Sequence, residues 1–171
     1  METELFVHFA EIAGVFVGFG ALISLRSARV TDAHDVVYLR SVLGLGVWVV
    51  VSALVPIAVA RYGVSGHRLW LVCASVALVV FAVVLALLSR TPEFRELDRS
   101  PELVDRVFPI VGLPLHLAIA GSLLLTILGV RTAIDEALYV TALTAGVVFA
   151  GYTLLACVLS QKQEPGPTAS G

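Results

Sequence analysis

Five long apolar runs separated by short polar segments dominate the pattern of this chain. Each run has about 20 residues or more, the length that an α-helix needs to cross the hydrocarbon core of a bilayer. The pattern predicts an all-α integral membrane bundle of five transmembrane helices, forming a single domain over residues 1–160. The expected spans are 5–25, 38–60, 69–88, 107–130 and 137–159, and residues 161–171 are expected to form a disordered tail rich in Pro and Gly.

The composition supports a membrane protein. The chain is 58% hydrophobic and 14% charged, with a mean hydropathy of +0.97, whereas soluble domains are about 45–50% apolar and about 25% charged. The net charge of −2 provides no basic field, so we expect no nucleic-acid partner. No Lys or Arg precedes Arg26, so the first run lacks the cationic start of a signal peptide and is expected to remain as a span.

The distribution of cationic side chains predicts an orientation. Eight of the eleven Lys and Arg residues fall in the connections and tail on one side of the predicted bundle. The side richer in Lys and Arg is normally cytoplasmic. We therefore expect the N-terminus outside and the C-terminus in the cytoplasm, with a prokaryotic plasma membrane as the location.

Glu11 is the sharpest candidate for function, because it lies inside the first apolar run. An ionisable group there costs roughly 2.5–3.5 kcal/mol on insertion scales. On a helical wheel Glu11 shares one stripe with Gly14, Gly18 and Ala21. Small residues let membrane helices approach closely. We expect this stripe to face another helix or a polar cavity, and the phenylalanines on the opposite side to face lipid.

The fifth run carries a second stripe of small residues, Ala142, Gly146 and Ala150. The same packing argument makes this stripe a helix contact. We therefore expect the bundle to pack through the small faces of the first and fifth spans.

His116 is the second candidate, near the centre of the fourth run. Pro109 and Pro114 predict a kink in the first half of that run. The expected depths separate His116 from Glu11 by about 10 Å along the membrane normal, which favours a water-bridged relay over a direct pair. The alternative is a histidine that is hydrogen-bonded to a neighbouring helix.

His8 lies one helical turn before Glu11 and is a third candidate for binding a proton or cation. Two side chains do not make a metal site. His8 and His116 are expected to differ in depth by roughly 14 Å, too far to ligate one haem iron. We expect no metal and no cofactor.

Two polar segments allow alternative interpretations. Asp32, His34 and Asp35 either cap the second helix or bind a divalent ion, and the cap is the simpler explanation. Residues 89–106 form either a solvated connector or a docking surface. No nucleophile motif or phosphate-binding glycine loop is present in the sequence, so we expect no enzyme.

Two functional hypotheses follow from these features. The first is transport or sensing of a proton or small cation, with Glu11 as the titrating group and His116 as a relay. The second is a non-catalytic accessory or assembly subunit of a membrane complex, in which Glu11 and the glycines make contacts. The expected partners are the lipid bilayer and either further copies of this chain or another membrane protein.

Overall fold

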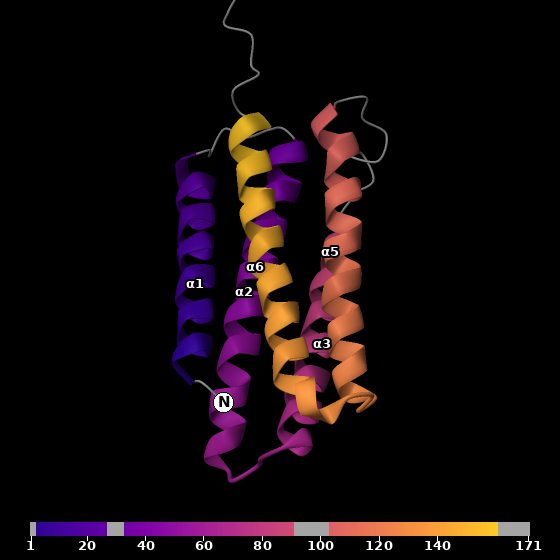
Figure 1. Cartoon of the computed structure of the whole chain (residues 1–171). Coiled ribbons are helices and arrows are strands. Elements are labelled where there is room, and N and C mark those ends of the chain that lie inside the picture. The colour runs from indigo at the N-terminus through magenta and orange to yellow at the C-terminus, as the bar shows by residue number, and fades with distance from the viewer. Residues whose placement is uncertain (1–2, 27–32, 91–102, 161–171) are drawn as a thin grey trace, which may run out of the picture.

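A computed structural model describes residues 3–26, 33–90 and 103–160 as an antiparallel bundle of helices (Figure 1). Helices α2 and α6 lie side by side between α1 and α5, and α3 packs against α2 and α5. The helices of the described residues are α1 Thr3–Arg26, α2 Ala33–Arg61, α3 His67–Ser89, α5 Leu103–Ile127 and α6 Asp135–Ser160, with a short 3₁₀ helix η1 at Thr132–Ile134.

Each of these five helices contains a segment long and apolar enough to cross a membrane. The prediction of an all-α fold with five helices long and apolar enough to cross a membrane is confirmed for the described residues, and the chain is a multi-pass membrane protein. In a bilayer the backbone must satisfy its own polar groups, and a helix does so within one segment. The segments are Thr3–Ile23, Val36–Arg61, His67–Ser89, Ile110–Ile127 and Thr132–Val158.

Trp48 of α2 lies at the centre of the core and is fully buried. Its Nε1–H donates a hydrogen bond of 2.8 Å to the backbone carbonyl of Ala77 in α3. On the other side, a side-chain carbon at Gly146 of α6 would overlap the indole ring. Ala142 and Ala150, one turn on either side of Gly146, are also buried. The small stripe of α6 therefore lets α6 approach α2 across the indole ring.

Helix α1 packs through a different face from the one that the sequence predicts. Phe6, Ala13 and Gly20, seven residues apart, are buried against the bundle. Val17 lies on the same side, so close to Gly46 of α2 that any side-chain carbon at Gly46 would collide with it. At this contact, Val17 of α1 occupies the space that Gly46 leaves on α2.

Contrary to the expectation for the first span, Gly14, Gly18 and Ala21 do not pack against another helix of the described residues. A side-chain carbon at Gly14 or Gly18 would meet nothing within 4 Å, and Ala21 is exposed. Of the phenylalanines expected to face lipid, Phe19 is exposed, whereas Phe9 and Phe16 are partly buried against the core. Helical periodicity shows two faces of α1 but does not show which one fits a neighbour, because both contain small residues.

The prolines interrupt neither helix that contains them. Helix α2 continues through Pro56 to Arg61, and α5 continues through Pro109 and Pro114. Asp32, the segment 91–102 and the tail 161–171 lie outside the described residues. The same is true of the side chains of His34 and Asp35.

Candidate functional site

Glu11 lies on the outer surface of α1, not against a helix or a cavity of its own chain. Its side chain is 66% exposed and that of His8 is 61% exposed. Nδ1 of His8 and Oε2 of Glu11 are 3.1 Å apart, and the carboxylate accepts the hydrogen bond. The structure thus joins two of the predicted site residues, on the side of α1 that faces away from the bundle.

His116 lies inside the bundle and is partly buried. Its ring packs between Phe81 of α3 and Phe149 of α6, with centroid distances of 5.7 and 4.7 Å. Nδ1 lies 2.7 Å from the carbonyl oxygen of Gly112, one turn earlier in the same helix. A carbonyl only accepts, so Nδ1 carries a proton. The partner belongs to the histidine's own helix and not to a neighbouring one.

Glu11 and His116 are not brought together. Helix α1 forms one side of the bundle and α5 forms the opposite side, with α2 and α6 between them (Figure 1). A proton relay between these two residues within one chain has no support from this arrangement.

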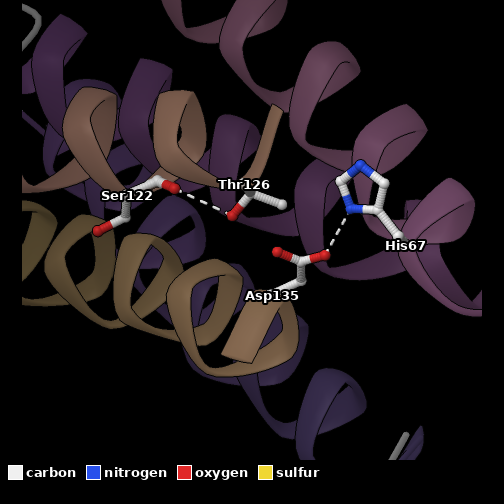
Figure 2. Close-up of polar contacts among 4 residues, drawn as sticks. All are labelled: His67, Ser122, Thr126 and Asp135. Carbon is white, nitrogen blue, oxygen red and sulfur yellow. Dashed lines mark hydrogen bonds and ion pairs between the residues drawn. The ribbon is translucent and has the colours of Figure 1, made fainter. Parts of the chain in front are cut away.

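The structure reveals a second ionisable pair, which the sequence analysis missed. His67 is the first residue of α3 and Asp135 is the first residue of α6. Nδ1 of His67 lies 2.6 Å from Oδ2 of Asp135 (Figure 2). The Asp135 side chain is 0% exposed, whereas that of His67 is 33% exposed. The pair therefore connects a fully buried carboxylate to the surface at one end of the bundle.

The turn between α5 and α6 positions Asp135. Gly129 ends α5 with a positive φ of 64°, and two hydrogen bonds close the helix end, from Gly129 N to Thr126 O and from Val130 N to Leu125 O. This is the Schellman arrangement, which favours glycine at that position. The chain then passes through η1 directly into α6. A side-chain carbon at Gly129 would lie 3.3 Å from Cε1 and Nε2 of His67, so the turn packs on the histidine ring.

An aromatic cluster lies one turn farther into the bundle. The rings of Phe6, Trp70 and Tyr139 have centroid distances of 5.5 to 6.2 Å. The Tyr139 hydroxyl donates a hydrogen bond of 2.6 Å to the carbonyl oxygen of Ser52. The cluster joins α1, α2, α3 and α6 at this end and separates Asp135 from the centre of the bundle.

Buried polar atoms gather around this end. Among the described residues, the buried side-chain atoms without a hydrogen-bond partner are Oδ1 of Asp135 and Oγ of Ser52. Thr126 is buried nearby, and its hydroxyl donates to the Ser122 carbonyl (Figure 2). A buried carboxylate needs a compensating charge or several donors. His67 is the side chain that provides one here.

The sequence contained a usable signal for this pair. His67 and Asp135 each lie two residues before a predicted span, 69–88 and 137–159, and both connections are expected at the same end of the bundle. The expected depths in the membrane therefore place the two residues at the same level. Only the structure shows that α3 lies next to the turn before α6, which brings the two side chains together.

The described residues contain no group of three or more His, Cys, Asp or Glu side chains that could hold a metal ion. Cys73 and Cys157 are buried, free thiols. Comparison of the chain with protein-family models, with curated proteins and with solved structures finds no match.

Proposed function

We propose that this chain is a non-catalytic subunit of a membrane assembly, and that the outer face of α1 is its contact surface. We define this face by Glu11, Gly14 and Gly18. The observation that carries the proposal is the exposed Glu11 side chain inside an apolar span, beside two glycines at which an added side-chain carbon would meet no atom of the described residues within 4 Å.

The cost of exposing the Glu11 side chain to lipid favours covering this face with another helix. Glu11 lies eight residues into the span that begins at Thr3, or roughly 12 Å along the helix axis. An ionisable side chain at such depth is costly in lipid, by roughly 2.5–3.5 kcal/mol near the centre. His8 satisfies one of its oxygens. A second helix would exclude lipid from the carboxylate and offer it further hydrogen-bond donors.

The glycines make such a contact geometrically simple. Membrane helices associate through small residues, because these allow the two backbones to approach. Val15 and Leu22 lie on the same side of α1 and are exposed, so they would supply apolar packing beside the glycines. Helix α1 is also the least buried of the five candidate spans.

The proposal includes a location and an orientation. We place the chain in a plasma membrane, with the N-terminus outside, as the distribution of Lys and Arg favours. In this orientation the His67–Asp135 end of the bundle faces the outside. The contact partner is a second copy of this chain or another membrane-spanning protein.

The test is the mass of the purified full-length protein in detergent, by light scattering after size-exclusion chromatography. We expect an assembly larger than one chain, and we expect Gly14→Leu with Gly18→Leu to reduce it to a single chain. Gly121→Leu is the matched control, since Gly121 of α5 also has nothing within 4 Å. A wild-type protein that is a single chain without a co-purified partner would contradict the proposal, as would an assembly unaffected by the two α1 substitutions.

A second candidate is movement of a proton or small cation along this contact. It is favoured by the His8–Glu11 pair, because these titratable groups lie on the face proposed to meet another chain. Proton uptake into proteoliposomes under an imposed potential tests it. Glu11→Gln should abolish the flux and leave expression and assembly mass intact, and unchanged flux would eliminate this candidate.

A further inference from the structure

The carboxylate of Asp135 is in an unusual position for a residue at the start of a helix. An acidic side chain that caps a helix accepts hydrogen bonds from amides of the first turn. Oδ1 of Asp135 accepts none from the described residues, and Oδ2 is engaged by His67 at 2.6 Å. Capping of α6 therefore does not account for this residue.

The protonation state of His67 determines the net charge of the His67–Asp135 pair. A buried carboxylate that has a single hydrogen-bond donor retains most of its charge, and an unpaired buried charge is very unfavourable. A neutral imidazole supplies only a hydrogen bond, whereas an imidazolium also supplies a full positive charge. The geometry thus favours binding of one additional proton by the pair.

We propose that His67 and Asp135 form a proton-binding site at the end of the bundle where α3 and α6 begin. In the occupied site the added proton resides on Nε2 of His67, and Nδ1–H donates to the Asp135 carboxylate. In the empty site Nε2 is unprotonated, and the Nδ1–H hydrogen bond remains. No other bond forms or breaks.

The site has a route to the aqueous phase. His67 is the first residue of α3, at the boundary of its candidate span, and one third of its side chain is exposed. The Cε1–Nε2 edge of the ring faces the turn at Gly129, where any side chain would crowd it. A glycine at that position leaves space beside the nitrogen that exchanges the proton.

Other titratable or charged groups lie on every element that meets at this end. Each of them contributes to the local field. They are Glu4 and His8 on α1, Arg61 at the end of α2 and Tyr62 just after it, Arg68 and Cys73 on α3, Arg131 on the turn, and Glu136 and Tyr139 on α6.

Occupancy of the site should affect the packing of this end. The pair connects α3 with the first residue of α6, and Gly129 holds the turn against the same ring. Release of the proton removes the positive charge of the donor, so the bond no longer joins two opposite charges. The start of α6 and the preceding turn should then open more often.

The direct test is nitrogen NMR of full-length protein with labelled histidine rings, titrated in nanodiscs between about pH 5 and pH 8. We expect both ring nitrogens of His67 to be protonated at the acid end and Nε2 to lose its proton within this range. His67→Gln assigns the signals. A His67 ring with a single proton throughout the range would overturn the proposal without the need for any variant.

Substitution of the acid provides the second part of the test. At the pH where half of the wild-type rings carry two protons, Asp135→Asn should lower that fraction from about one half to about one tenth or less. Glu11→Gln is the matched control, because it removes the acid of the exposed His8–Glu11 pair and should leave the His67 signals unchanged. An Asp135→Asn protein with an unaltered His67 titration would overturn the proposal.

Discussion

The hydroxyl of Tyr139 in α6 donates a hydrogen bond of 2.6 Å to the backbone carbonyl of Ser52 in α2. In an α-helix this carbonyl would accept from the amide four residues later, but that residue is Pro56, which has no N–H. The phenol from a neighbouring helix replaces the missing donor. Proline inside a membrane helix is tolerated when a neighbour satisfies the freed carbonyl in this way.

Removal of this hydroxyl should destabilise the bundle. Tyr139→Phe leaves the Ser52 carbonyl buried without a donor, and we expect a loss of about 1–2 kcal/mol in the free energy of unfolding. Unfolding in mixed detergent micelles measures the change. Tyr62→Phe, on an exposed ring in the turn after α2, should have no effect. Equal stabilities of Tyr139→Phe and wild type would contradict this role for the hydroxyl.

Pro56→Ala should make the hydroxyl of Tyr139 less important. Alanine restores the backbone N–H that pairs with the Ser52 carbonyl within α2. In the Pro56→Ala background, Tyr139→Phe should therefore cost clearly less than it does in the wild type. A double-mutant cycle in the same micelles measures the difference, and strictly additive effects would show that the two residues are not coupled.

Gly146→Ala should destabilise the core by about 1–3 kcal/mol. A side-chain carbon at Gly146 would overlap the ring of Trp48, which is fully buried and held by its bond to Ala77. The ring cannot move without breaking that bond. Gly121→Ala, where a side chain meets nothing within 4 Å, is the matched control. In thermal unfolding in detergent, the Gly146→Ala protein should have a clearly lower melting temperature than the Gly121→Ala protein.

Gly129→Ala and Gly63→Ala should distinguish two causes of destabilisation at helix ends, the positive φ angle and steric contact with a neighbouring side chain. Both glycines have positive φ, 64° and 78°, a conformation that costs other residues roughly 1–2 kcal/mol. At Gly63 a side chain has free space, whereas at Gly129 it would press on the His67 ring. Gly129→Ala should therefore lose more unfolding free energy than Gly63→Ala. Equal losses would mean that the ring moves aside freely.

Removal of the His67 side chain and removal of the Asp135 side chain should destabilise the protein by different amounts. His67→Ala leaves a buried carboxylate without its partner, which costs about 3–5 kcal/mol. Asp135→Ala leaves a histidine that is partly exposed and can remain neutral, so it should cost less. The double variant should be more stable than His67→Ala alone. Unfolding in micelles at neutral pH tests this order, and a double variant that is the least stable of the three would contradict it.

The fold class could be predicted almost completely from local properties of the sequence. Run length and hydropathy are properties of each segment alone, and a bilayer permits a lone apolar segment little besides a helix. The expected spans therefore differ from the observed segments by a few residues at the ends. The buried small stripe at Ala142, Gly146 and Ala150 was also visible, as three small residues at a spacing of four.

What the sequence by itself determined is the number, length and type of the elements, together with the position of Glu11 inside the first span. Only the tertiary structure decided that Gly46 receives Val17, so that α1 turns Glu11 outward, and that His67 meets Asp135. The physical reason is that lipid and neighbouring helices are both apolar, so hydropathy does not separate an inner face from an outer one. Shape complementarity and the pairing of buried polar groups make that choice, and both depend on residues that are distant in the chain.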